Sequence, residues 1–98
     1  MKSIVQQEKE CFLCRYLYNR ENLINLQEHH CIHGTANRAL SEKYGLKVFL
    51  CIYHHTQGLG AVHKNRDYDL IVIKEAQRKF EEKYGHDKFM EVFKKNYL

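Results

Sequence analysis

The sequence contains two pairs of residues of the kinds that bind metals, and the members of each pair are three residues apart. Cys11 and Cys14 form a Cys-x-x-Cys pair, and Cys51 and His54 form a Cys-x-x-His pair. Two residues three apart in a tight knuckle or a first helical turn point the same way, so each pair offers two ligands to one ion. Thiolates and imidazoles are ligands of structural Zn²⁺, and two such pairs complete a tetrahedron. The spacing predicts a structural zinc site in preference to unligated core cysteines or a redox pair.

The remaining cysteine lies outside both pairs. Cys31 follows a histidine doublet and could replace one zinc ligand, but a small buried thiol is the favoured interpretation. The N-terminal segment carries charges at residues 8–10 where a signal peptide needs an apolar core, and no apolar run is long enough to cross a membrane. We therefore expect a cytoplasmic protein without a membrane partner, in which the cysteines are thiols or metal ligands rather than disulfides.

Four histidines occur as two adjacent doublets, His29-His30 and His54-His55. Neighbours on a strand point to opposite faces, and neighbours on a helical turn diverge by about 100°. Each doublet should therefore be divided between two sites. If His54 completes the zinc site, His55 faces elsewhere, and one histidine of the first doublet can join it at a second metal. The leftover histidine is a candidate general base. Taken singly, each of these histidines is more simply a surface or satisfied core residue.

The elements that must position these residues form an α+β pattern. Residues 46–50 read as a strand, and the more polar segment 23–30 as its partner. Thr35 or Asn37 could open a short helix that ends before Gly45. Apolar residues three or four apart predict an amphipathic helix over 67–84, capped by Asp67 and ended at Gly85; the pattern lists Leu70, Ile73, Ala76, Phe80 and Tyr84. A second helix, capped by Asp87, should carry Phe89, Val92, Phe93 and Tyr97.

Length and composition limit the chain to one domain. Its 98 residues are 44% hydrophobic and 29% charged, enough to fold around one core and too few for a second. We expect a zinc and catalytic region over residues 11–66 and a helical pair over 67–98. The net charge of +4 is compatible with a polyanionic partner, but without clustering on one face it reads as an ordinary solvated surface.

Together these motifs resemble the HNH, or ββα-metal, endonuclease superfamily in its zinc-stapled form. The elements that match are Cys11-x2-Cys14, Glu28-His29-His30, Asn37 and Leu50-Cys51-x2-His54-His55. Further stretches resemble small HNH-like proteins of Gram-positive prophages: Ala36-Asn37-Arg38, residues 41–48, Ala61-Val62-His63 and residues 95–98. The resemblance covers nearly the whole chain. It implies an α+β fold in which a zinc-stapled, treble-clef-like ββα-metal unit precedes the C-terminal helical pair.

The resemblance also implies a role for each matching residue. Cys11, Cys14, Cys51 and His54 would bind the structural zinc. His29 and His55 would bind one catalytic divalent metal such as Mg²⁺ or Mn²⁺, and His63 is a candidate third ligand. His30 would be the general base that activates water. Asn37 would fix the loop between the strands through backbone hydrogen bonds and so hold His30 in its working orientation.

These assignments predict a metal-dependent nuclease that hydrolyses DNA phosphodiester bonds with little sequence preference. Arg38, with Lys43, Lys47, Lys64 and Arg66, could contact flanking phosphates, although most of these side chains are more simply solvated charges. The alternative is a non-catalytic zinc module that binds nucleic acid or a phage or host protein, and a third interpretation is a degenerate member that keeps the fold without the activity. The module needs the Cys-rich zinc site but has no use for the second metal group.

Overall fold

A two-stranded antiparallel sheet lies at the centre of the fold. The computed structural model describes residues 2–98, in which β1 (Leu26–His30) pairs with β2 (Lys47–Cys51). In the register, His29 lies opposite Val48 and His30 opposite Lys47. Paired residues share a face of the sheet, and neighbours along a strand alternate. His29 and His30 therefore lie on opposite faces, as the doublet predicted.

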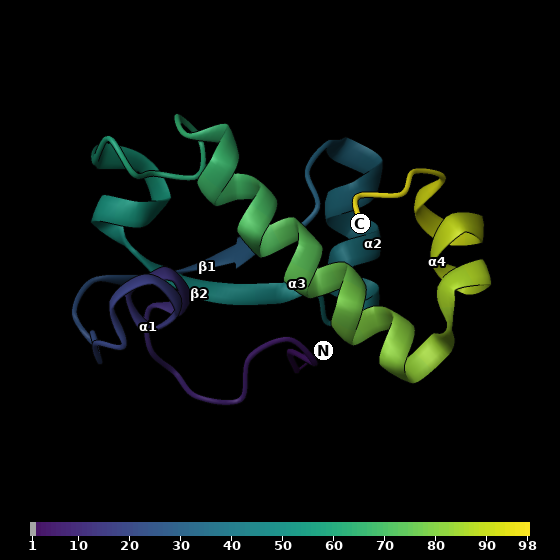
Figure 1. Cartoon of the computed structure of the whole chain (residues 1–98), viewed down its shortest axis with the longest axis horizontal. Coiled ribbons are helices and arrows are strands. Elements are labelled where there is room, and N and C mark those ends of the chain that lie inside the picture. The colour runs from purple at the N-terminus through teal and green to yellow at the C-terminus, as the bar shows by residue number, and fades with distance from the viewer. Residues whose placement is uncertain (1) are drawn as a thin grey trace.

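Four α-helices and one π-helical turn surround the sheet within residues 2–98: α1 (Phe12–Tyr18), α2 (Thr35–Tyr44), η1 (Tyr53–Gln57), α3 (Arg66–Tyr84) and α4 (His86–Phe93). Figure 1 shows α3 running across the sheet, with α1 and η1 near one end of the molecule and α2 and α4 near the other. The chain is a small α+β protein with a C-terminal helical pair, in which α3 packs against α4.

The strands are displaced from their predicted bounds for local reasons. β2 spans 47–51 rather than 46–50, and β1 begins at Leu26 rather than at residue 23. Asn25 has a φ of 54°, in the left-handed region, which ends any extended segment before it. Leu23 and Ile24 are 58% and 72% exposed, so they pack on no sheet face.

The cap of α3 is Asn65, not Asp67. The Asn65 side chain accepts a hydrogen bond from the backbone N–H of Tyr68, and Asp67 lies in the first turn, where a negative charge is favoured by the helix dipole. The buried face of α3 also differs from the prediction, since it includes Asp69 and Gln77 and leaves Leu70 half-buried. A prediction made from the spacing of apolar residues could not include these two buried polar residues.

Glycines lie at the C-terminal ends of α2 and α3. α2 stops at Gly45, whose φ of 72° and ψ of 30° are left-handed, as predicted. Gly85 has a φ of 90° but an extended ψ of 161°, so it joins α3 to α4 without forming a left-handed cap. α4 begins at His86 without a side-chain cap, where Asp87 was expected, and Tyr97 lies beyond its end.

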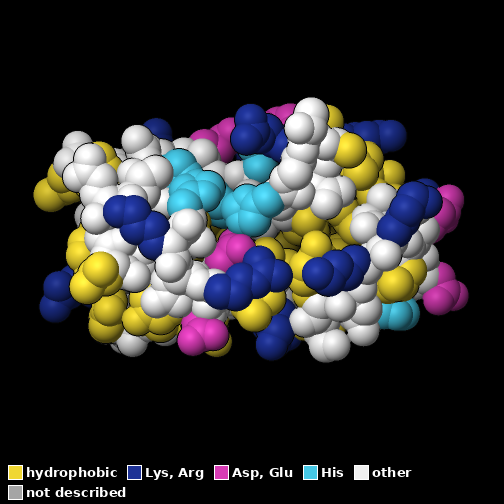
Figure 2. All heavy atoms as spheres, turned by 90° about the horizontal axis from the view of Figure 1, so that it is seen from above, with side chains coloured by type: hydrophobic (Ala, Val, Ile, Leu, Met, Phe, Trp, Pro, Cys, Tyr) yellow, Lys and Arg dark blue, Asp and Glu magenta, His cyan; other side chains and the backbone are white. Residues whose placement is uncertain are grey.

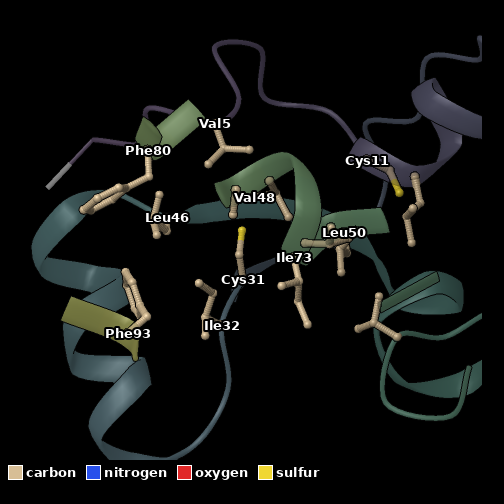
Figure 3. Packing of buried hydrophobic residues seen from close by; sticks show 14 of the residues in the cluster. Val5, Cys11, Cys31, Ile32, Leu46, Val48, Leu50, Ile73, Phe80 and Phe93 are labelled. Carbon is tan, nitrogen blue, oxygen red and sulfur yellow. The ribbon is translucent and has the colours of Figure 1, made fainter. Parts of the chain in front are cut away.

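The core fills the space between the sheet and the helices (Figure 3). Val48 and Leu50 of β2 face Ile73 of α3, and all three are nearly inaccessible. At the end near α4, the Phe80 ring packs against the Phe89 ring at a centroid distance of 5.4 Å. This packing fixes α3 over the sheet and so fixes the position of its first turn, which reaches the histidines described below.

Candidate metal centres

The four predicted zinc ligands meet in one buried cluster. Cys11 precedes α1, Cys14 lies in its first turn, Cys51 ends β2, and His54 lies in η1. The His54 Nδ1 atom lies 3.6 Å from the Cys11 sulfur and 3.4 Å from the sulfurs of Cys14 and Cys51. The Cys14 and Cys51 sulfurs are 3.9 Å apart. The two pairs therefore converge, as their spacing predicted.

These separations fit a tetrahedral ion. With Zn–S near 2.3 Å and Zn–N near 2.1 Å, tetrahedral geometry places ligand atoms about 3.6 to 3.8 Å apart. The observed spread of 3.4 to 3.9 Å brackets that range. No Cys–Cys disulfide joins these residues, since all four cysteines are free thiols. The cluster can hold a structural metal such as zinc through three thiolates and the Nδ1 atom of one imidazole.

The surroundings of the cluster suit thiolates that are paired with a cation. Burial raises the pKa of the Cys11 thiol to about 12, although backbone hydrogen bonds from Cys51 and Cys14 lower it. Two N–H groups point at the sulfurs: the backbone N–H of Cys14 at Cys11, and the Asn22 amide at Cys14. Cys31 is also fully buried but lies outside this cluster, as the favoured interpretation expected.

A second group of ligand atoms comes from His29, His55 and His63, whose ligand atoms all lie within 4.8 Å of one another. His29 lies on β1, His55 on η1, and His63 on the connection to α3. His54 and His55 are thus divided between the two groups, in agreement with the prediction. The turn Gly58–Gly60 brings His63 back, so its ring centroid lies 5.0 Å from that of His55.

Two of these imidazoles are prepared to bind an ion, His55 by a hydrogen bond and His29 by burial. The His55 Nδ1 lies 2.6 Å from the Gln27 side-chain oxygen, so a donated N–H there leaves Nε2 as the free acceptor. The His29 Nε2 atom is buried and has no hydrogen-bond partner among residues 2–98. Burial, followed by the nearby His33, His55 and His63, lowers the pKa of His29 to about 3. A neutral, unpaired imidazole nitrogen in this position is suited to a metal.

The group opens onto a pocket of about 330 Å³, lined by Glu28, His29, His30, Ile32, His33, Arg38, His55 and His63. Figure 2 shows histidine side chains gathered on one face, with Lys and Arg side chains placed around them. Of the predicted phosphate contacts, Arg38 lines the pocket. Lys47 instead pairs with Glu42 at 2.9 Å on the other face of the sheet.

The predicted base, His30, lies at the edge of the same pocket but faces away from the three-histidine group. Its Nε2 atom lies 2.9 Å from a Glu42 carboxylate oxygen, and the same carboxylate accepts from Lys47. Hydrogen bonding to His30 is the largest cause that lowers the pKa of the Glu42 carboxyl. Strand alternation accounts for this position, because His29 occupies the face that meets η1.

Ser41 makes the loop contact that the resemblance assigned to Asn37. The fully buried Ser41 hydroxyl donates to the Ile32 carbonyl at 3.2 Å and accepts from the Ile32 N–H at 3.4 Å. Asn37 is half-buried on α2, and no hydrogen bond of its side chain is found within residues 2–98. The loop after β1 is therefore tied to α2 by a different residue.

Three residues near the pocket were not singled out by sequence. They are Gln27, His33 and Asp69. His33 Nε2 lies 2.6 Å from an Asp69 oxygen, and the other Asp69 oxygen accepts from Arg66 at 2.8 Å. The only sequence signal was the position of Gln27 two residues before His29, which places both on one strand face. Nothing local connects His33 with Asp69.

Comparisons of the chain with protein-family models, curated proteins and solved structures give no match. Within residues 2–98, no helix is both long enough and apolar enough to span a membrane. What is established is therefore a small α+β protein with a buried cluster of three cysteines and one histidine that can bind a metal such as zinc.

Proposed function

We propose that the protein is a metal-dependent endonuclease of the HNH type, which hydrolyses DNA phosphodiester bonds with little sequence preference. One observation carries the proposal: the group of His29, His55 and His63 opens onto a pocket, and His55 comes from the same turn, η1, as the cluster ligand His54. A purely structural zinc protein has no need of a second set of convergent imidazoles.

The donor set suits a catalytic ion. Three imidazoles leave coordination positions for water and substrate, whereas the Cys-rich cluster uses all four positions for protein ligands. A divalent ion held by the three histidines would supply positive charge that stabilises the phosphate and the leaving 3′ oxygen. Gln27 orients the ring of His55, and β1 orients His29.

The remaining pocket residues have roles that follow from their chemistry. Arg38, on the first turns of α2, can pair with a phosphate oxygen and place the backbone without reading its sequence. The resemblance assigns the general base to His30, whose Nε2 contacts Glu42 at 2.9 Å, but any pocket histidine with a free ring nitrogen can take this proton. In the proposed reaction, water attacks phosphorus, its proton passes to a histidine, and the bond to the 3′ oxygen breaks.

The alternative function is a non-catalytic zinc module that binds nucleic acid or a phage or host protein. The observation that favours it is the completeness of the buried cluster without any contribution from the pocket histidines. The two functions differ in what they require, because the module gains nothing from His55. Removing that side chain while keeping the zinc therefore discriminates between them.

The test is a supercoiled-plasmid nicking assay on zinc-loaded protein with Mn²⁺, with Mg²⁺ and with EDTA. Wild type should nick DNA only with added metal, and His55→Ala should retain its zinc and fold but lose at least about 100-fold in rate. His86→Ala is a matched control, since His86 pairs with Glu81 on the exposed C-terminal region and should leave nicking unchanged. Zinc-loaded wild type that leaves supercoiled, branched and single-stranded DNA intact would favour the module.

A further inference from the structure

The pair of His33 and Asp69 is the one histidine–carboxylate contact in residues 2–98 in which the carboxylate is buried. The Asp69 side chain is 6% exposed, against 44% for Glu42 and 20% for Glu81 in the other two pairs. Its two oxygens are both used, one by His33 at 2.6 Å and one by Arg66 at 2.8 Å. These two contacts fix the carboxylate in position.

His33 lies against the three-histidine group without being part of it. Its ring centroid lies 5.0 Å from that of His29 and 5.7 Å from that of His63. Within residues 2–98, a ligand atom of His33 lies within 4.8 Å of ligand atoms of both His29 and Asp69, and His33 does not belong to the group of His55 and His63. His33 would therefore neighbour an ion held by His29, His55 and His63, and with His29 and Asp69 it forms a second possible ligand set.

The orientation of His33 determines which of its ring nitrogens can accept a proton. Because a carboxylate only accepts hydrogen bonds, His33 donates its Nε2–H to Asp69, and Nδ1 carries the free lone pair. His33 lines the pocket, and its side chain is 37% exposed. His30 differs in position: its contact with Glu42 holds it on the opposite face of the sheet, and its ring makes no contact with the rings of His29, His55 and His63 among the described residues.

We propose that His33 is the catalytic proton acceptor of this site in place of His30, and that Asp69 is the residue that positions it. This inference rests on the proposed nuclease function. A water molecule in the pocket gives its proton to the His33 Nδ1 as its oxygen forms a bond to phosphorus. The bond from phosphorus to the 3′ oxygen breaks, that oxygen takes a proton from solvent, and Asp69 stabilises the imidazolium until His33 releases its proton.

The first experiment compares His33→Ala, His30→Ala and the control His86→Ala in the nicking assay, with Mn²⁺ binding measured by calorimetry on the same zinc-loaded proteins. His33→Ala should lose about 10² to 10⁴-fold in nicking rate, with Mn²⁺ affinity close to that of wild type. His30→Ala should lose less than about tenfold, and added imidazole should partly restore His33→Ala.

The second experiment uses Asp69→Asn, which preserves shape, and reads the His33 tautomer by long-range ¹H–¹⁵N NMR. Wild type should show a proton on Nε2, and Asp69→Asn should lose that preference while the NMR signals of the trio stay in place. This variant keeps the inference testable if His33→Ala does not fold.

Several outcomes overturn the assignment. Wild-type rates in His33→Ala would show that another group takes the proton, and a loss of Mn²⁺ affinity matching that of His55→Ala would make His33 a ligand instead. Absence of nicking by wild type would overturn the nuclease function itself and the role of His33 with it. A nicking wild type beside an unaffected His33→Ala would refute only the present inference.

Discussion

Replacing one ligand of the Cys-rich cluster should remove a large part of the stability of the fold. The cluster joins Cys11 to His54 across a sequence separation of 43 residues. By the chain-entropy relation for a cross-link, closing a loop of that size in the unfolded chain is worth about 4 kcal/mol. A domain of this length has about 5 to 15 kcal/mol in total. Loss of the metal in Cys14→Ser should therefore remove roughly a quarter to four fifths of that stability, and the lost metal–sulfur bonding adds to the loss.

The assay combines elemental analysis with thermal melting followed by circular dichroism. Wild type should carry one zinc per chain and lose its cooperative melting transition when a strong chelator removes the metal. Cys14→Ser should resemble the chelated protein. Cys31→Ala is the matched control, because Cys31 is fully buried but outside the cluster; it should keep its zinc and lose only about 1 kcal/mol. The reasoning would be refuted if wild type carried no zinc and Cys14→Ser melted at the same temperature as wild type.

Further predictions concern the pocket, the loop, the core and acid stability. Isothermal titration should give tighter binding of Mn²⁺ or Co²⁺ than of Mg²⁺, because the donors are imidazoles, and His63→Ala should weaken that binding about 10 to 100-fold. Ser41→Ala should lower the free energy of unfolding in urea by about 1 to 3 kcal/mol, because it leaves the buried N–H and C=O groups of Ile32 without this partner. Phe80→Ala should cost about 3 to 5 kcal/mol in the same measurement, since the ring is fully buried. The Arg15 hydrogen bond lowers the pKa of Glu10, so its stabilisation is present above the ordinary carboxyl pKa and is lost as pH falls; Arg15→Ala should flatten the acid limb of stability against pH, and an unchanged limb would contradict this.

The sequence was sufficient for those features that depend on local spacing. Cys11 and Cys14, like Cys51 and His54, lie three apart, so the turn geometry that aims both ligands is contained in four residues. The division of each histidine doublet followed from strand alternation and from the rotation per residue along a turn. The glycine at the end of α2 was equally readable, because few other residues adopt its left-handed conformation.

Features that depend on distant residues could not be predicted in this way. Asp69 meets His33 across a separation of 36 residues, and no periodicity marks an aspartate on the buried face of a helix as a partner for a particular histidine. The same holds for Ser41, whose hydroxyl completes a loop nine residues earlier. Local chemistry also misled at the starts of α3 and α4, because Asn65 rather than Asp67 caps α3 and Asp87 lies inside the first turn of α4.

The division of His54 and His55 between two groups has a thermodynamic consequence. η1 contains only five residues, and two backbone hydrogen bonds, from Gly58 to Tyr53 and from Val62 to His54, hold it closed. When an ion fixes His54, the conformational entropy of His55 is already lost, at about 1 to 2 kcal/mol per backbone residue. An ion in the pocket would therefore bind about five to thirty times more tightly to the zinc-loaded chain than to a chain in which η1 must first be ordered. By reciprocity, occupancy of the pocket would strengthen zinc retention by the same factor.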